Sequence, residues 1–245
     1  MSRTLARRAS AEFAGTALLV AAVVGSGIAA ARLSPGDVGL QLLENAVATA
    51  FALGALILIF GPVSGAHLNP VVSAVDWWLG RRAGTGLTGT DLAAYTVAQI
   101  TGAIAGAVLA NLMFDLPAAT WSATDRAGGN LWLAEVVATA GLVVLVFALA
   151  RSGRTASAPA AVGAYIGAAY WFTSSTSFAN PAVTIGRAFT DTFAGIAPTS
   201  VPGFVAAQLV GGLVGVAALA AWYPHAKGAA DDVLVPHLAQ EPETR

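Results

Sequence analysis

Six apolar stretches of near-membrane length constrain this chain more than any other feature of its sequence. They fall at about residues 11–31, 40–60, 92–114, 131–150, 158–176 and 202–222. Each is close to the ~20 residues that an α-helix needs to cross ~30 Å of hydrocarbon. Only 10% of the residues are charged, whereas a typical soluble domain has about 25%. The sequence therefore predicts an all-α membrane protein with six transmembrane helices.

Composition also limits the chemistry of the chain. It contains no cysteine, which excludes disulfides and thiolate metal sites, and its net charge of −1 gives no reason to expect nucleic acid as a partner. We expect no cofactor and no metal. The basic start, Met1 to Arg8, resembles a signal peptide, but the apolar stretch that follows is long for one. We therefore interpret it as a retained first span.

The positions of lysine and arginine predict the orientation. Twelve are present. Three would lie on or toward one side, at Arg32, Arg126 and Arg187, and the other nine on the opposite side. The richer side is expected to be cytoplasmic. This places the protein in the cell membrane as a multi-pass protein with both termini inside, including a C-terminal tail at 225–245.

Two shorter segments follow the second and fifth spans. They begin at Asn69-Pro70 and Asn180-Pro181, and each lasts about 10 residues, which as helix is about 15 Å. Proline suits the first turn of a helix, and asparagine before it is a good N-cap. Each segment is therefore predicted to be a re-entrant half-helix that crosses half a bilayer.

The two halves of the chain repeat one another. EFAGT at 12–16 matches EVVAT at 135–139, NPV at 69–71 matches NPA at 180–182, and QITGAIAG from 99 matches QLVGGLVG from 208. Each half holds three spans, so the halves have opposite orientations and form an inverted repeat. We expect one channel domain over residues 1–224, with repeats at about 10–114 and 131–222.

Within these repeats, two glycine pairs occupy matching places. Gly102 and Gly106 stand four residues apart in the third span, and Gly211 and Gly215 in the sixth. Small residues at this spacing let two membrane helices approach closely. The pairs are therefore expected to be packing faces.

The two half-helices predict a pore. In an inverted repeat their N-termini meet near the midplane, so both helix dipoles direct positive ends at one place and repel cations. The amides of Asn69 and Asn180 can donate hydrogen bonds to a passing oxygen. Irregular backbone at this depth is tolerated where it lines a water-filled path. The pore carbonyls are expected at Gly65, Ala66, His67, Ser177, Phe178 and Ala179. The alternative, two simple capped helix starts, does not account for the duplication.

Both loops resemble those of a known family. SGAHLNPVVS at 64–73 and SFANPAV at 177–183 are similar to the two signature loops of the aquaporin (major intrinsic protein) family, and the resemblance covers about residues 10–224. It implies the aquaporin-like fold, a homotetramer and one pore in each subunit. Pro70, Pro181 and Ala182 agree with the family motif, whereas Val71 replaces its alanine.

Two buried carboxylates and one histidine have alternative interpretations. Glu12 and Glu135 lie inside the first and fourth spans and can form either a proton relay or a structural brace for the re-entrant loops. Their symmetric placement favours the brace, as the resemblance also implies. His67 can act as a pH gate or ligand, or can brace its loop by a hydrogen bond. We favour the hydrogen bond.

The resemblance also implies a selectivity filter, and this sequence departs from it. The positions correspond to Thr49, to Ala168 or Tyr170, to Ser177 and to Val183, where the family usually has arginine. The filter is therefore expected to be wide and uncharged. Arg187, four residues further on, either compensates for the missing arginine or has a structural role. We favour the structural role, in a pair with Asp191.

These features favour passive permeation of water and small neutral solutes. Glycerol-like polyols and undissociated metalloid hydroxides such as arsenicals have suitable size, and some bacterial relatives with an altered filter are linked with arsenic handling. A coupled secondary transporter also uses inverted repeats, but no further titratable group lies at depth. An enzyme would need a nucleophile and a base at depth, and neither is evident.

Overall fold

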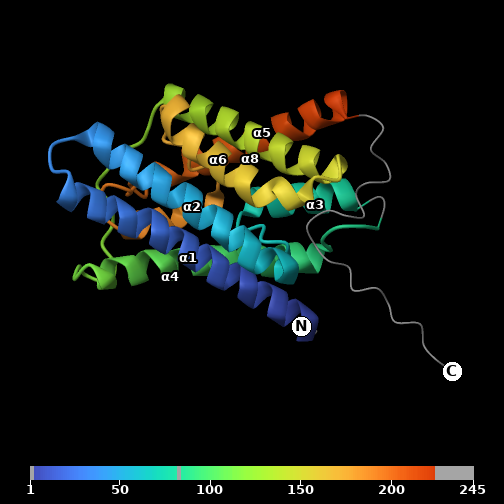
Figure 1. The fold of residues 1–245 in the computed structure, drawn as a ribbon, viewed down its shortest axis with the longest axis horizontal. Coiled ribbons are helices and arrows are strands. Elements are labelled where there is room, and N and C mark those ends of the chain that lie inside the picture. The colour runs from blue at the N-terminus through green and yellow to red at the C-terminus, as the bar shows by residue number, and fades with distance from the viewer. Residues whose placement is uncertain (1–2, 82–83, 224–245) are drawn as a thin grey trace.

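The computed structural model describes residues 3–81 and 84–223, which form a bundle of helices (Figure 1). The C-terminal tail expected at 225–245 lies outside the described residues. The α-helices are α1 Arg3–Leu33, α2 Val38–Ser64, α3 Pro70–Gly80, α4 Gly89–Met113, α5 Gly129–Arg151, α6 Ala158–Phe172, α7 Pro181–Gly186 and α8 Val201–Trp222. Two short 3₁₀-helices, η1 Thr155–Ser157 and η2 Arg187–Phe189, complete the described structure.

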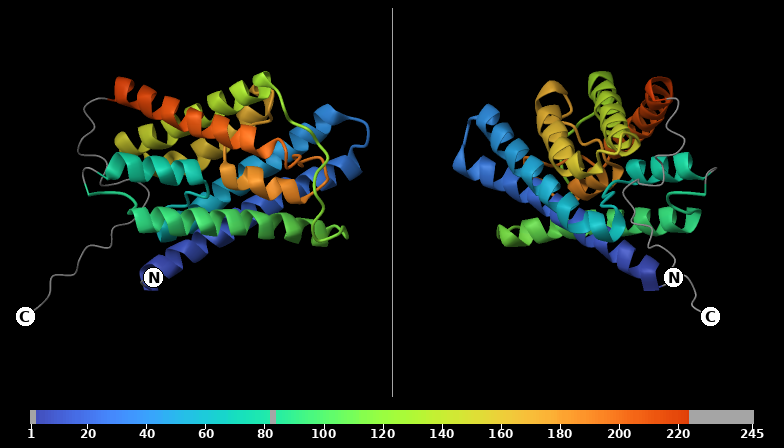
Figure 2. Two further views of the ribbon diagram at one scale, coloured as in Figure 1. Left: turned by 180° about the vertical axis from the view of Figure 1, so that it is seen from behind. Right: turned by 45° about the vertical axis from the view of Figure 1, so that its right-hand side comes forward.

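The arrangement matches the expected inverted repeat. Helices α1, α2 and α4 lie on one side of the bundle, and α5, α6 and α8 on the other (Figures 1 and 2). The half-helices α3 and α7 lie between them and enter from opposite ends (Figure 2). The start of α1 and the end of α8 lie at the same end of the bundle, as an even number of spans requires.

Two elements are shorter than the sequence predicts. Among the described residues, five helices are long and apolar enough to cross a membrane. The expected span at 158–176 is a helix of 15 residues, α6, because the backbone becomes extended at Thr173 and enters the second re-entrant loop. The second half-helix is α7 with six residues, and it tightens into the three-residue η2.

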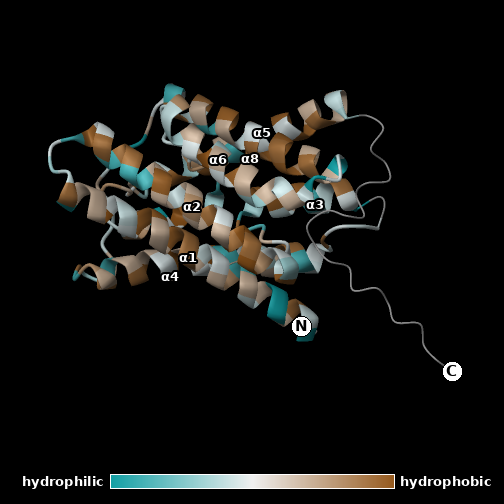
Figure 3. Cartoon of the chain, in the orientation of Figure 1, coloured by the Kyte–Doolittle hydropathy of each residue, from teal (hydrophilic) through white to brown (hydrophobic). Residues whose placement is uncertain are grey.

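The outer surface of the bundle is apolar. Hydrophobic residues cover most of the outward faces of the long helices (Figure 3). Phe51 is 75% exposed and Leu213 is 68% exposed, although both lie in the middle of a helix. In water such a surface would be unfavourable, whereas in lipid it is the expected one.

The glycine pairs form the predicted close helix contacts. A Cβ atom at Gly106 would lie 2.1 Å from the Ala17 carbonyl oxygen of α1, and one at Gly102 would lie 2.4 Å from the Phe13 carbonyl oxygen. In the second half, a Cβ at Gly211 would lie 2.7 Å from a carbonyl oxygen of α5. The backbones of α1 and α4, and of α5 and α8, therefore approach so closely that only glycine fits.

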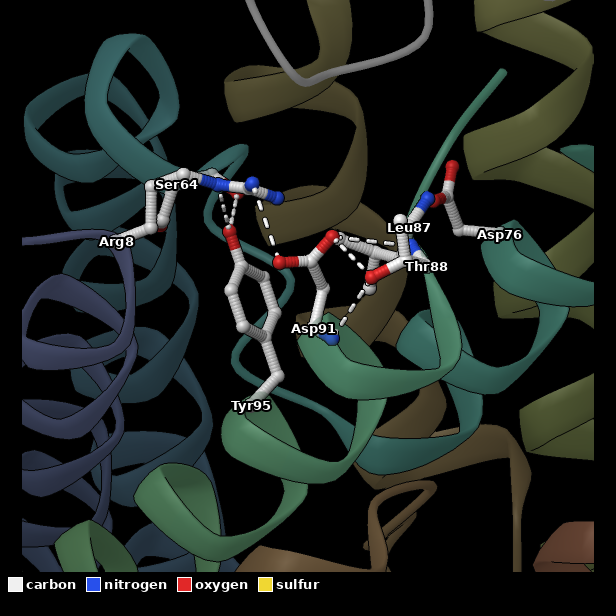
Figure 4. A network of polar contacts seen from close by, with 7 residues as sticks. All are labelled: Arg8, Ser64, Asp76, Leu87, Thr88, Asp91 and Tyr95. Atoms are coloured by element: carbon white, nitrogen blue, oxygen red, sulfur yellow. Dashed lines mark hydrogen bonds and ion pairs between the residues drawn. The ribbon is translucent and has the colours of Figure 1, made fainter. Parts of the chain in front are cut away.

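A polar network holds the end of the bundle where the chain begins (Figure 4). Arg8 Nε donates to the Tyr95 hydroxyl at 2.9 Å, and this hydroxyl donates to the Ser64 carbonyl at 2.7 Å. Arg8 also lies 3.6 Å from Asp91, which forms a capping box with Thr88 at the start of α4. The network ties α1 and α4 to the last residue of α2, at the point where the first re-entrant loop starts.

The contact at Gly106 generates a stability prediction. Gly106→Val should destabilise the protein by at least about 1–3 kcal/mol, because the added atoms overlap rigid backbone of α1. The measurement is the midpoint of thermal aggregation of the detergent-solubilised protein. Gly129→Ala is the control, since its Cβ meets nothing within 4 Å. Equal midpoints for the two variants would contradict the close contact.

Candidate functional site: two re-entrant loops around a narrow cavity

Both re-entrant loops use the same strained backbone before their asparagine. Ala66 and Leu68 have φ values of 48° and 49°, and Ser177 and Ala179 have φ values of 50° and 48°. In both loops these residues stand three positions and one position before the asparagine. A left-handed conformation at residues other than glycine costs about 1–3 kcal/mol each. The loops therefore need partners that hold them in place.

Glu12 of α1 holds the first loop. Its carboxylate accepts hydrogen bonds from the backbone N–H groups of His67 at 3.0 Å and Leu68 at 2.7 Å, and from the Ser64 hydroxyl at 2.6 Å. The side chain is fully buried. Hydrogen bonds to an ionised acceptor are about twice as strong as neutral ones, so they offset the cost of burying the charge and of bending the loop.

Glu135 of α5 holds the second loop in the same way. It is also fully buried, and its carboxylate accepts from the backbone N–H groups of Phe178 at 2.9 Å and Ala179 at 2.8 Å. In each carboxylate, both oxygens thus accept hydrogen bonds from backbone N–H groups of the loop in the same repeat. This geometry is that of a brace for each loop.

Two glutamines complete these clusters, and the sequence analysis did not assign them a role. Gln99 Nε2 donates to the Glu12 carboxylate at 2.7 Å, and Gln208 Nε2 donates to Glu135 at 2.6 Å. Each amide also donates to a hydroxyl in the half-helix of its own repeat, at 3.0 Å and 2.8 Å. Both glutamines begin the third matching motif of the repeat. Their equivalent positions in the two halves are the sequence feature that could have indicated a shared role.

The two asparagines join the loops to each other. Asn69 Nδ2 donates to the Ala179 carbonyl at 2.8 Å, and Asn180 Nδ2 donates to the Leu68 carbonyl at 2.7 Å. Each Oδ1 accepts from N–H groups at the start of its own half-helix. An amide nitrogen carries two hydrogens, so each asparagine keeps one donor after the cross-link is made.

A narrow cavity of about 80 Å³ lies against both loops. The predicted site residues that line it are Thr49, Gly65, Ala66, His67, Asn69, Tyr170, Ser177, Phe178, Ala179, Asn180 and Val183. The remaining motif residues begin the half-helices behind it and are Pro70, Val71, Pro181 and Ala182. The structure therefore gathers residues from both halves of the chain around one space.

The side chain of Val71 is accommodated by a glycine on α8. Val71 is 2% exposed. A Cβ atom at Gly212 would lie 2.8 Å from Val71 Cγ1, so the absence of a side chain at Gly212 makes room for the larger residue. Valine in place of the usual alanine is therefore accommodated where the half-helix packs against α8.

His67 is held within its loop. The ring is 5% exposed, its Nδ1 lies 3.1 Å from the Ser73 hydroxyl, and it packs edge-on against Tyr95 with ring centroids 5.5 Å apart. This is the hydrogen bond that the loop-bracing interpretation requires. Nε2 has no hydrogen-bond partner among the described residues.

The filter positions are only partly as expected. Thr49 and Tyr170 line the cavity, and their hydroxyl oxygens lie 3.2 Å apart. Ala168, the other candidate on α6, is exposed on the outside of the helix and does not line the cavity. Ser177 is 3% exposed, and its hydroxyl has no partner among residues 3–81 and 84–223.

The structure differs from two expectations about charge. Arg187 lines the cavity and is 2% exposed, so the space beside Val183 contains a cationic side chain. Arg187 also does not pair with Asp191, which instead accepts a hydrogen bond from the Ala123 N–H at 2.9 Å. The sequence separation suggested the pair, but the turn of η2 directs Arg187 inward and leaves Asp191 exposed.

Two re-entrant half-helices, a lipid-facing exterior and a cavity lined by both asparagines define a membrane channel. The sequence matches the Major intrinsic protein family over residues 1–177. The aquaglyceroporin AqpS of Rhizobium meliloti is 54% identical over 213 residues, which are 87% of this chain and 88% of that protein. The chain belongs to the major intrinsic protein (aquaporin) family, whose members are channels and not enzymes.

More distant relatives agree. Aquaporin AqpM of Methanothermobacter marburgensis is 29% identical, with 91% of this chain and 98% of that protein covered. The X-ray structure of the aquaglyceroporin from Plasmodium falciparum matches with a TM-score of 0.65 at 19% identity. That match covers 90% of this chain and 97% of the other. These comparisons confirm the predicted fold class.

The loop braces generate a prediction that tests their structural role. Glu135→Gln should lower stability by at least about 1–3 kcal/mol, because its amide group cannot accept every bond that the carboxylate accepts. It should also reduce channel flux, and Glu12→Gln should behave alike. The measurement is the thermal midpoint together with flux per folded channel in liposomes. Glu44→Gln, at a partly exposed position on α2, is the control. A folded variant that changes only proton flux would support a relay instead.

The two candidates for the filter generate a second prediction. Because the chain has no cysteine, Tyr170→Cys introduces a single thiol into the cavity, which Tyr170 lines. A water-soluble thiol reagent should then block solute flux. Ala168→Cys is the matched control, and it should remain unaffected because its side chain faces outward. If the reagent inhibits solute flux only in the Ala168→Cys variant, the filter lies elsewhere.

Proposed function

We propose that this protein is a passive channel for water and small neutral solutes that carry several hydroxyl groups. Glycerol-like polyols and undissociated metalloid hydroxides, such as arsenous or boric acid, belong to this class. One observation carries the proposal: hydroxyl groups of Thr49, Tyr170 and Ser177 meet at one cavity, which Val183 also lines. Valine at this position leaves room that the family's usual arginine would occupy.

The rest of the lining supports this choice of solute. Leu142, Val146 and Ile166 give the cavity an apolar wall beside the hydroxyl groups. A solute that is polar on one side and less polar on the other can contact both surfaces. Among the described residues, no aspartate or glutamate lines the cavity, so no anionic side chain there attracts a cation. The name of the relative AqpS, an aquaglyceroporin, agrees with this solute class.

The alternative of a coupled transporter has less support. Coupling requires a group that binds an ion or proton and alternates its exposure. Among the described residues, Glu12 and Glu135 are fixed by N–H donors of the loops and by glutamines, and the third buried carboxylate, Asp76, accepts from the Leu87 N–H. Passive permeation needs no such group.

We further propose that residues 1–224 form one channel domain in the cell membrane, with both termini and the tail at 225–245 in the cytoplasm. Basic residues at the end of the bundle where the chain begins support this orientation. We also propose a homotetramer. An apolar groove of about 760 Å³ between α2 and α6, with small residues such as Gly54, Gly163 and Gly167, supports contact with another subunit.

The test is stopped-flow shrinkage of liposomes that contain the purified protein. Water, glycerol and arsenous acid should all permeate faster than in protein-free liposomes, and the flux should follow only the gradient of the solute. Asn180→Leu is the control for a closed pore. Accumulation of glycerol against its gradient, driven by pH or voltage, would support the transporter instead.

The same assay with Val183→Arg tests the filter. The added side chain narrows the cavity, so the flux of glycerol and arsenous acid should fall more than the flux of water. We expect the ratio of glycerol flux to water flux to fall by about tenfold, which is a barrier difference of about 1.4 kcal/mol. A ratio that stays the same or rises would show that Val183 does not determine the width of the filter.

A further inference from the structure

Arg187 lines the cavity, although it lies one helical turn beyond Val183, the position where the family usually has arginine. Its backbone N–H donates to the Val183 carbonyl, so it follows Val183 by a single turn. Side chains of a helix lean toward its N-terminus, which for this half-helix is the end at Asn180. The side chain therefore extends back toward the cavity, where it joins Ser177 and Val183 in the lining.

The guanidinium group is fixed, but its terminal nitrogens form no hydrogen bond with the described residues. Arg187 Nε donates to the Ala194 carbonyl, and Cζ lies 3.5 Å from the centre of the Phe178 ring. No other hydrogen bond of this side chain is formed with residues 3–81 or 84–223. An arginine carries five N–H donors, so the donors on the terminal nitrogens remain for a molecule in the cavity.

Among residues 3–81 and 84–223, no carboxylate forms an ion pair with Arg187, and Glu135 acts on its charge only from a distance. Within the described part of the chain, the one ion pair joins Arg8, near the start of α1, to Asp91, near the start of α4. Asp191 is engaged elsewhere by the Ala123 N–H. A second arginine, Arg126, lies over the same Phe178 ring at 5.2 Å. Two cationic groups therefore lie against this ring, and one of them borders the cavity.

Arg126 is the matched control for Arg187, because it lies over the same Phe178 ring but borders no part of the cavity. Its Nε donates to the Gly195 carbonyl at 2.9 Å, and it does not line the cavity. Burial lowers the pKa of Arg126, while the carboxylate of Glu135 raises it. Since an arginine remains protonated in proteins, both residues carry charge, but only Arg187 presents it to a permeating molecule.

We propose that Arg187 is the selectivity-determining cation of this pore and takes over, from one turn away, the role that Val183 cannot fulfil. Its terminal nitrogens donate hydrogen bonds to the hydroxyl oxygens of neutral solutes, while hydronium and metal cations meet its full charge. Val183 makes the filter wide, and Arg187 keeps it selective for neutral molecules. This inference rests on the proposed function as a channel for neutral solutes.

The first experiment locates the side chain. Arg187→Cys and Arg126→Cys are made in this cysteine-free chain, and glycerol flux is measured before and after addition of a mercurial benzenesulfonate. Modification should lower flux by about tenfold in Arg187→Cys and by less than about twofold in Arg126→Cys, because a bulky group obstructs only the lined path. Equal, small effects in both folded variants would overturn the proposal.

The second experiment tests the charge and remains decisive if the cysteine variant does not fold. Arg187→Met keeps length but removes charge, and Arg187→Lys keeps charge. Proton leak into liposomes, measured with an enclosed pH dye, should rise by about tenfold in the methionine variant and stay near wild type in the lysine variant. A methionine variant with wild-type leak and wild-type glycerol flux would overturn the proposal.

The experiments distinguish an incorrect channel function from an incorrect role of Arg187. If the wild-type protein transports no glycerol or water above protein-free liposomes, the proposed function is wrong. If the wild type transports them but Arg187→Cys is insensitive to the mercurial and Arg187→Met retains full selectivity, only the role of Arg187 is wrong.

Discussion

Two fully buried carboxylates are the constraint on which the rest of this channel depends. Glu12 and Glu135 accept backbone N–H groups from loops that contain left-handed residues other than glycine. Such backbone is unfavourable in a bilayer unless fixed partners satisfy it. The strength of charged hydrogen bonds makes the irregular loops stable, and the irregular loops place the polar groups of the pore.

The positions of the half-helices and of the two asparagines depend on loops that are held in this way. Once both are in place, the half-helices begin at Asn69 and Asn180, and each asparagine reaches the carbonyl of the opposite loop. The helix ends then direct their positive dipoles at one position. Close contacts at Gly106 and Gly211 bring the outer helices near enough for the carboxylates to reach the loops.

In the proposed filter, one chemical role is divided between two positions. Val183 removes bulk where the family usually has arginine, and Arg187 supplies a cation one turn later on the same short helix. Width and charge, which a single arginine would combine, are therefore set by different residues. On this arrangement the pore can admit a larger neutral solute without losing its electrostatic barrier.

The sequence by itself determined the approximate positions of the spans and half-helices, the inverted repeat and the paired carboxylates, because hydrophobic length and repeated motifs are local properties that a bilayer enforces. It could not choose between Ala168 and Tyr170, since the rotation of α6 depends on its neighbours. It also missed the contacts of Gln99 and Gln208 with the carboxylates. The inward direction of Arg187 depended on the tight turn of η2 and on the Phe178 ring. Only tertiary structure decides such features, because they join residues far apart in sequence.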